Sequence, residues 1–519
     1  MTLTQNIKPK TFFATNPRTG QALKQEFTES TAEEINNAVA QAEAAFAPYR
    51  AKTASERAAF LDKIGEEIVA IGDILITTCS DETGLPEGRL QGERGRTVNQ
   101  LKLFAELLRE GSWVQAIIET AQPDRQPLPK PDTRSLQIPL GPVGVFGASN
   151  FPLAFSVAGG DTASALAAGC PVVAKAHPAH PATSQLVADA IIRAAAATGM
   201  PAGVFSLIHG PSVEVGMTLV QHPLIKAIGF TGSFRGGKAI FDAAVRRPEP
   251  IPVYAEMGST NPVFILPRAL QQRQEALAQG LVNSITLGVG QFCTNPGLVI
   301  SLASDQTNTF VNKAGEILAA VQPGTMLTPG IKTAYDQGLQ KLSNVNNVQV
   351  IARGPASDAS CAGSAHLLKT DAETFVANPE LAEEVFGPSS VVITADSKEQ
   401  LLEIAHNLHG HLTATIHGTP EDLEEYTELI RLLERKVGRL LLNGYPTGVE
   451  VGHAMVHGGP YPATTDARST SVGTTAIYRF VRPICYQDFP QQLLPEALKN
   501  DNPSNIWRKV NGSFTKEKI

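Results

Sequence analysis

The chain has 519 residues, of which 42% are hydrophobic and 18% charged, with 44 glycines and 36 prolines. This composition is typical of a globular, turn-rich protein and excludes a disordered or fibrous one, and the length predicts two or three structural units. The net charge of -7 and the lack of a long Lys/Arg stripe exclude general nucleic-acid binding.

The N-terminal segment Met1–Ala14 lacks the continuous apolar core of a signal peptide, and no stretch of the chain approaches a membrane span. We therefore expect a cytoplasmic protein without membrane insertion. The cysteines are odd in number and scattered, without CxxC pairs or zinc-ligand spacing, so the sequence predicts neither a disulfide framework nor a metal site. They are Cys79, Cys170, Cys293, Cys361 and Cys485.

Two amphipathic helices are predicted near the start, over residues 31–46 and 53–68. Each begins with a threonine followed three residues later by a glutamate, the pattern of a capping box. A further helix is expected over residues 94–109.

Between Gly141 and Leu266 short apolar runs alternate with helical segments, which predicts a parallel sheet with helical crossovers. The expected strands are 143–146, 172–174, 205–208, 225–230 and 263–266, and the expected helices are 154–168, 184–197, 213–221 and 237–245. A second α/β block is predicted over residues 261–459, with a helix at 277–287. Ligands in such sheets bind beyond the carboxyl ends of the strands.

Three side chains stand out as candidates for chemistry. Cys293 lies in a Gly- and Pro-punctuated loop, Gly290-Gln-Phe-Cys-Thr-Asn-Pro-Gly, where a thiol can be exposed and serve as a nucleophile once it is ionised. Glu256 lies between apolar neighbours before a predicted strand and could activate a water molecule. Asn150 follows a strand-turn, where its amide could stabilise an oxyanion. Taken singly, the three are equally compatible with a structural cysteine, a surface acid and a local Asx-turn.

A Gly-rich turn over residues 230–237, Phe-Thr-Gly-Ser-Phe-Arg-Gly-Gly, connects a predicted strand to a predicted helix. Backbone amides in such a turn can approach a pyrophosphate. The segment is neither a GxGxxG nor a GxxxxGK[ST] motif, so on its own it is a weak indication of nucleotide binding.

Taken together and in chain order, these segments resemble the aldehyde dehydrogenase superfamily from the N-terminal helices to about Val481. Six segments carry the resemblance: 144–152 with Asn150, 172–175 with Lys175, 230–237, 256–259 with Glu256, 290–293 with Cys293, and Glu384-Val-Phe386-Gly-Pro.

The resemblance implies an NAD(P)-dependent oxidation of an aldehyde to a carboxylic acid, without a metal. Cys293 would attack the aldehyde, Asn150 would hold the oxyanion, hydride would pass to the nicotinamide, and Glu256 would activate the water that hydrolyses the thioester. Lys175, Gly232, Ser233 and Gly237 would bind the adenosine and pyrophosphate parts, and Glu384 and Phe386 the nicotinamide half.

The implied fold class is α/β, with two Rossmann-like parallel-sheet domains and a small β arm for oligomerisation. Residues 1–132 and 142–260 would form the cofactor-binding domain and 261–459 the catalytic domain. Residues 133–141 and 470–487 would form the arm, with a strand near 474–481, and residues 488–519 a surface extension. By the same resemblance the protein would be a homodimer or homotetramer.

Departures from the family pattern indicate a narrower branch. The lysine segment reads Lys175-Ala-His-Pro, without the glutamate that grips the ribose of NAD, which favours NADP while allowing NAD. The segments Ser149-Asn-Phe-Pro, Gly159-Gly-Asp and His453 to Pro462 are similar to 2,5-dioxovalerate (α-ketoglutarate semialdehyde) dehydrogenases and to related broad-specificity or fatty aldehyde dehydrogenases. For a substrate with a distal carboxylate, Arg96 is the candidate cation, although a surface or ion-pair role fits it equally.

Two alternatives belong to other classes. A thiol hydrolase or acyl transferase would need a histidine beside Cys293, and the chain offers His177, His180, His453 and His457, but none of these explains the Gly-rich turn or the Glu384 motif. A non-catalytic binding protein on this fold would be expected to lose Cys293, Glu256 or Asn150, and all three are present.

Overall fold

The computed structural model describes residues 10–519, so the first nine residues of the segment Met1–Ala14 lie outside it. Its first large sheet is parallel throughout, in the order β7-β6-β5-β8-β9. The strands are β5 (Val143–Phe146), β6 (Val172–Lys175), β7 (Phe205–Ile208), β8 (Ala227–Thr231) and β9 (Val253–Glu256). The sequence predicted the first four. Its fifth run, residues 263–266, was wrongly placed in this sheet, because Val263 pairs with Val299 in the second one.

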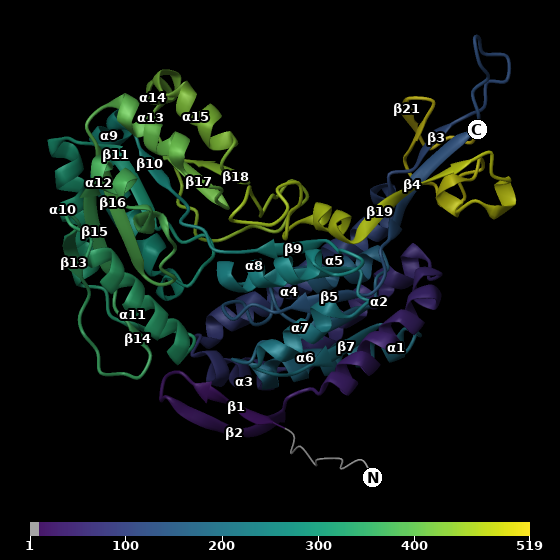
Figure 1. The fold of residues 1–519 in the computed structure, drawn as a ribbon, viewed down its shortest axis with the longest axis horizontal. Helices are drawn as coiled ribbons and strands as arrows, with labels where there is room; N and C mark the ends of the chain where they lie inside the picture. Colours follow the sequence, from purple (N-terminus) through teal and green to yellow (C-terminus); the bar gives the residue numbers. More distant parts are fainter. Residues whose placement is uncertain (1–9) are drawn as a thin grey trace.

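Helices cover both faces of this sheet, as alternating apolar side chains on its strands require (Figure 1). On one face Val143 and Val145 pack with α2 (Ala54–Ala70), α4 (Glu87–Glu110), α5 (Gly160–Ala168) and α6 (Pro181–Ala197). The other face packs against α1 (Ala32–Arg50), α7 (Val213–Gln221) and α8 (Phe234–Val245), and α3 (Asp73–Thr83) joins α2 to α4. Both predicted capping boxes, at the starts of α1 and α2, are present.

The second sheet has the order β13-β15-β16-β11-β10-β17-β18 and is parallel except for β13. Its strands are β10 (Val263–Ile265), β11 (Leu298–Leu302), β13 (Gln349–Arg353), β15 (His366–Asp371), β16 (Ser389–Ala395), β17 (Thr413–His417) and β18 (Arg439–Leu442). Helix α9 (Pro267–Thr286) begins ten residues before the predicted start, with Pro267 in its first turn. The predicted α/β fold class with two parallel-sheet units is confirmed.

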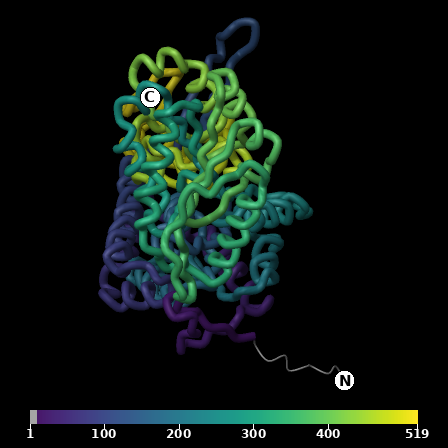
Figure 2. The backbone as a smooth tube through the Cα atoms, turned by 90° about the vertical axis from the view of Figure 1, so that its left-hand side faces the viewer, coloured from purple at the N-terminus to yellow at the C-terminus, as the bar shows by residue number. Residues whose placement is uncertain are grey.

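Shorter elements complete this second unit and the chain's start. They are α10 (Asp305–Ala319), α11 (Pro329–Ser343), α12 (Ala372–Ala377), α13 (Lys398–Asn407), α14 (Pro420–Glu425), α15 (Thr427–Glu434), the pair β12 (Gly324–Thr325) and β14 (Ala362–Gly363), the 3-10 turns η2 (Leu287–Gly290) and η3 (Pro379–Ala382), and the hairpin β1 (Thr11–Asn16) and β2 (Gln21–Thr28). Seen from the side, the hairpin lies at the end of the molecule opposite the C-terminus (Figure 2).

A third sheet forms an arm that projects from the first unit, in the order β19-β4-β3-β20-β21 (Figure 1). Its strands are β3 (Ile117–Glu119), β4 (Thr133–Pro139), β19 (Val481–Gln487), β20 (Arg508–Val510) and β21 (Ser513–Thr515), with the 3-10 turns η1 (Ser112–Val114), η4 (Thr474–Phe480), η5 (Gln491–Leu493) and η6 (Glu496–Leu498). Three expectations need correction here. Residues 488–519 add two strands to this sheet and are therefore part of the arm, β3 belongs to the sheet because it pairs with β4, and residues 474–480 form a turn before the strand.

The C-terminal segment is held together internally by Arg508, whose side chain is fully buried. Its guanidinium donates to the carbonyl oxygens of Lys499, Asn500 and Glu517. Each carbonyl satisfies part of a buried charge that would otherwise be costly. Within the described residues, no helix has the length and apolar character needed to cross a membrane.

Ending the chain at Asn500 is expected to lower the thermal midpoint and to promote aggregation. The truncation removes β20 and β21 and leaves the backbone groups of β3 as an open edge. Differential scanning calorimetry with light scattering measures both effects. Lys518→Ala, a change in the same segment that leaves both strands intact, is the control. A truncated chain as stable and monodisperse as the control would contradict the structural role of the tail.

Candidate active site

The parallel strands of the first sheet deliver candidate site residues from their carboxyl ends. Lys175 is the last residue of β6, Glu256 is the last residue of β9, and Asn150 follows β5. Gly232 and Ser233 follow β8 and lead into α8. The loops of the second unit face this edge, which is where ligands of such sheets bind.

A cavity of about 700 Å³ lies between the two units at this edge and is lined by residues of both. Eight of the ten residues predicted for the site line it, namely Cys293, Glu256, Asn150, Lys175, Gly232, Ser233, Glu384 and Phe386. Gly237 and Arg96 do not. A Cβ atom on Gly237 would lie 2.6 Å from the Met257 side chain, so this glycine packs behind the cavity wall.

Cys293 lies in a loop between η2 and β11 that is fixed by a side chain the sequence analysis did not single out. The Nδ2 atom of Asn261 donates to the backbone oxygens of Cys293 and Asn295, each at 2.9 Å. Asn261 itself has a φ of 45°, a conformation that asparagine tolerates better than most residues. The Cys293 thiol is half-buried and faces the cavity.

Glu256 and His457 form a buried pair beside this thiol. His457 Nε2 lies 2.8 Å from Glu256 Oε1 and 3.4 Å from Cys293 Sγ. The second carboxylate oxygen of Glu256 accepts a hydrogen bond of 2.5 Å from Ser471 Oγ. Because an ionised carboxylate only accepts, the ring nitrogen donates to Glu256 in this arrangement.

The charges of this cluster act on one another. Burial alone would raise the pKa of the Glu256 carboxyl, but the His457 ring and the hydroxyl of Ser471 outweigh it, so the pKa is lowered and Glu256 is ionised at neutral pH. Burial raises the pKa of the Cys293 thiol well above its ordinary value, and the charge of Glu256 raises it further, while Arg96 lowers it. The resting thiol is therefore protonated and needs a proton acceptor before it can attack.

The Asn150 side chain is turned toward the nucleophile loop. Its Nδ2 atom donates to the backbone oxygen of Gln291 at 3.0 Å, and its own backbone oxygen accepts a hydrogen bond from Arg89. An amide nitrogen carries two protons, so fixing one of them orients the second. The arrangement can hold a developing negative charge near the thiol.

The far end of the cavity has the features of a nucleotide site. Burial lowers the pKa of the Lys175 ammonium to about 8, and no salt bridge of Lys175 occurs within residues 10–519. Ser233 caps α8, and its Oγ accepts from the amide of Gly236. A Cβ on Gly232 would lie 2.7 Å from the ring of Phe230, so the turn is compact there. A buried cation and the start of a helix beside a large cavity fit the phosphate and ribose groups of a dinucleotide.

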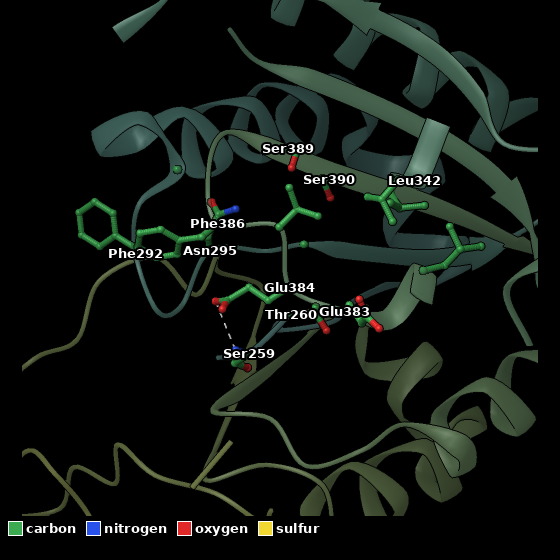
Figure 3. Close-up of a pocket in the computed structure, with 15 residues that line it drawn as sticks. Ser259, Thr260, Phe292, Asn295, Leu342, Glu383, Glu384, Phe386, Ser389 and Ser390 are labelled. Atoms are coloured by element: carbon green, nitrogen blue, oxygen red, sulfur yellow. Dashed lines mark hydrogen bonds between the residues drawn. The ribbon is translucent and has the colours of Figure 1, made fainter. Parts of the chain in front are cut away.

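Glu384 and Phe386 lie on the loop between η3 and β16, and the Glu384 carboxylate points toward Ser259 (Figure 3). Glu384 Oε1 accepts from the amide of Ser259 at 3.3 Å. The Glu384 side chain is open to the cavity, and the only effect that raises the pKa of its carboxyl is the partial loss of water beside the cavity walls.

Arg96, on α4, lies outside the cavity wall but close to the reacting groups. Its guanidinium carbon is 5.6 Å and 5.3 Å from the ring centres of Phe151 and Phe155. Its Nε and Nη2 atoms are buried without hydrogen-bond partners among the described residues. A guanidinium held on aromatic faces with two unpaired N–H groups can donate hydrogen bonds to a carboxylate or carbonyl oxygen of a ligand.

Comparisons with known proteins agree with this geometry. The model of the aldehyde dehydrogenase family matches residues 4–471. The chain is 53% identical to α-ketoglutaric semialdehyde dehydrogenase 2 of Azospirillum brasilense, over 92% of this chain and 91% of the relative. It is 50% identical to an α-ketoglutaric semialdehyde dehydrogenase of Acinetobacter baylyi, over 94% and 93%. Among solved structures, lactaldehyde dehydrogenase is similar with a TM-score of 0.79 and 22% identity, over 92% of this chain and 95% of that one.

The chain therefore belongs to the aldehyde dehydrogenase family. It is an oxidoreductase that uses NAD(P) to oxidise an aldehyde. The neighbour PnpE, a structure solved in complex with nicotinamide adenine dinucleotide, shares the fold with a TM-score of 0.77 at 21% identity, over 92% of this chain and 94% of that one. The histidine that a thiol hydrolase would require is present as His457, but the family and the cavity decide against that class.

Glu256→Gln is expected to shift the pH profile of Cys293 alkylation by iodoacetamide to lower pH. The substitution removes the negative charge that raises the pKa of the thiol, so the thiolate forms at lower pH. Mass spectrometry of the Cys293 peptide follows the rate at each pH. Glu383→Gln, which removes an exposed carboxylate on the Glu384 loop, should leave the profile in place. A profile that stays or moves upward in Glu256→Gln would show that Glu256 does not control this thiol.

Proposed function

We propose that this enzyme oxidises 2,5-dioxovalerate, the semialdehyde of α-ketoglutarate, to 2-oxoglutarate, and that it prefers NADP to NAD. The substrate assignment depends on two relatives that are 53% and 50% identical over more than nine tenths of the chain. Both are named α-ketoglutaric semialdehyde dehydrogenase. Arg96 supports it, because its unsatisfied guanidinium offers a partner for the distal carboxylate of this substrate.

In the proposed mechanism Cys293 attacks the carbonyl carbon after its proton has passed to the carboxylate of Glu256, which later releases it to solvent. His457 Nε2, 3.4 Å from the thiol sulfur, already donates its proton to Glu256 and therefore orients this carboxylate without taking the thiol proton itself. The free amide proton of Asn150 binds the substrate oxygen as it becomes negative. The oxidised nicotinamide supplies a hydride acceptor when it is bound.

Hydrolysis of the resulting thioester requires a base, and Glu256 fills this role in the proposal. Its carboxylate is ionised, but both oxygens are occupied, one by His457 and one by Ser471. The carboxylate must exchange one of these partners for the attacking water. Ser471 and Thr470, whose Oγ1 accepts from the His457 amide, keep the pair in place during this exchange.

The preference for NADP rests on the charge of the adenosine end of the cavity. The only carboxylates among its described lining residues are Glu256 and Glu384, both on the side of the thiol. Near Lys175 the lining residues are His177 and Pro178, and burial keeps the His177 ring neutral by lowering its pKa. None of the lining residues beside Lys175 is an acid that would oppose a 2′-phosphate, and Lys175, on which the charge of Glu29 also acts, provides a cation.

Assembly is part of the same proposal. Strands β19 and β21 are the open edges of the arm, and its surface exposes Phe489, Leu493 and Phe514. We infer a cytoplasmic homodimer or homotetramer in which other subunits cover this arm. Residues 1–132 with 142–260, apart from strand β3 in the arm, would act as the cofactor-binding domain and 261–459 as the catalytic domain.

Steady-state kinetics with 2,5-dioxovalerate, hexanal and a long-chain aldehyde, each with NADP and with NAD, test the function. We expect the highest kcat/KM for 2,5-dioxovalerate with NADP, and a loss of at least about 10³-fold in Cys293→Ala because the nucleophile is gone. Cys485→Ala, which removes an exposed thiol on the arm, should retain activity. A higher kcat/KM for the apolar aldehydes would refute the substrate, and full activity of Cys293→Ala would refute the mechanism.

Arg96→Met is expected to raise the KM for 2,5-dioxovalerate by roughly 10- to 100-fold, since a charge-assisted hydrogen bond contributes about 1.5 to 3 kcal/mol. The KM for hexanal, which has no carboxylate, should change by no more than a few fold. Arg94→Met, two residues away on α4 with its guanidinium bonded to the Gly72 oxygen, is the matched control. An equal rise in KM for both aldehydes would show that Arg96 affects the shape of the substrate site without binding the carboxylate.

A further inference from the structure

We propose that Glu256, Cys293 and His457 form a binding site for one Zn²⁺ ion and that the ion inhibits the enzyme. One ligand atom from each residue, a carboxylate oxygen, Sγ and a ring nitrogen, lies within 4.8 Å of the other two. The inhibitory effect rests on the roles of these residues in the proposed function, whereas the binding site rests on their positions alone.

The distances are close to those of a zinc site before the ion enters. With bonds of about 2.0 Å to oxygen and nitrogen and about 2.3 Å to sulfur, tetrahedral ligands lie roughly 3.3 to 3.8 Å apart. His457 Nε2 and Cys293 Sγ are already 3.4 Å apart, and His457 Nε2 and Glu256 Oε1 are 2.8 Å apart. The second pair has to separate by roughly 0.5 Å, and the third pair, the Glu256 oxygen and Cys293 Sγ, lies within 4.8 Å.

The charges of the three ligands match a divalent ion. A carboxylate and a thiolate together offset two positive charges, and a neutral imidazole adds none. On binding, the thiol of Cys293 loses its proton to water, and the proton of His457 moves to Nδ1. Nearby, Glu384 adds negative charge and Arg96 adds positive charge, and both affect the thiol.

The surroundings of the three residues fit an inhibitory zinc site in which the fourth coordination position is taken by water. Ser471 Oγ donates to Glu256 Oε2 and leaves Oε1 beside His457 Nε2, so the carboxylate is oriented by a supporting hydrogen bond as in metal sites. The cavity of about 700 Å³ reaches Cys293, so an ion can enter and keep a water as its fourth ligand. His457 Nδ1 is buried without a partner among the described residues, so we expect a dissociation constant on the order of micromolar and not a tight structural site.

Anaerobic titration of the full-length protein with Co²⁺, without aldehyde or nucleotide, tests the site directly. We expect one Co²⁺ per chain and a near-ultraviolet thiolate-to-cobalt absorption band that Zn²⁺ displaces stoichiometrically. Cys293→Ser should abolish the band, and Glu256→Gln and His457→Gln should each weaken Zn²⁺ binding by at least about 10-fold. Zn²⁺ should inhibit aldehyde oxidation over the same concentration range.

His453→Gln, which changes an exposed histidine four residues before His457, and Cys485→Ser are matched controls that should keep the band and the affinity. Circular dichroism shows which variants are folded. If Cys293→Ser or His457→Gln does not fold, the Zn²⁺ affinity of the conservative variant Glu256→Gln still tests the site. No binding below about 100 μM Zn²⁺, a band that survives Cys293→Ser, or an affinity unchanged in both Glu256→Gln and His457→Gln would overturn the proposal. Because the spectra need no turnover, a wrong substrate assignment would leave them unaffected.

Discussion

The active site depends on a close contact between two backbone segments of the second unit. Gly290 has a φ of +64°, and a Cβ on it would lie 2.3 Å from the carbonyl carbon of Gly387. Asn295 Nδ2 also donates to the Gly387 oxygen, at 3.3 Å. The loop of the nucleophile and the loop of Glu384 are therefore held as one surface, and any side chain at position 290 would force them apart. The distance between the thiol and the nicotinamide half of the cavity follows from this contact.

The buried cluster shows how the same low-dielectric surroundings serve two opposite needs. A carboxylate in such a place is costly unless it is paired, and Glu256 is paired with His457 and Ser471. The pairing keeps Glu256 ionised for use as a base, but its charge works against ionisation of Cys293. Arg96 opposes that effect from the other side. An enzyme that needs both a base and a thiolate thus profits from a histidine that donates to the carboxylate, because this hydrogen bond keeps the carboxylate ionised and able to take the thiol proton.

The sequence was most informative where short-range patterns determine the structure. The capping boxes of α1 and α2 and four strands of the first sheet follow from local spacing, and the Cys293, Glu256 and Asn150 segments stand out through their neighbours. His457 and Ser471 could not be placed in this way, because they meet Glu256 from 201 and 215 residues away in the chain. Strands β20 and β21 were missed for the same reason. Both are three residues long; β20 pairs with β3 across most of the chain, and β21 is added to the sheet only through β20.

The three side chains at the reaction centre do not by themselves define the reaction class. A thiol, an imidazole and a carboxylate in hydrogen-bonding distance would also serve a thiol hydrolase. What distinguishes this chain is the space in front of the thiol, which extends to Lys175 and the start of α8 and is far larger than an acyl group needs. Since a hydride acceptor has to lie against the carbon that the thiol attacks, a cavity that runs from the sulfur to a phosphate-binding helix start selects oxidation over simple hydrolysis. The sheet edge that provides this cavity, and not the nucleophile alone, sets the chemistry.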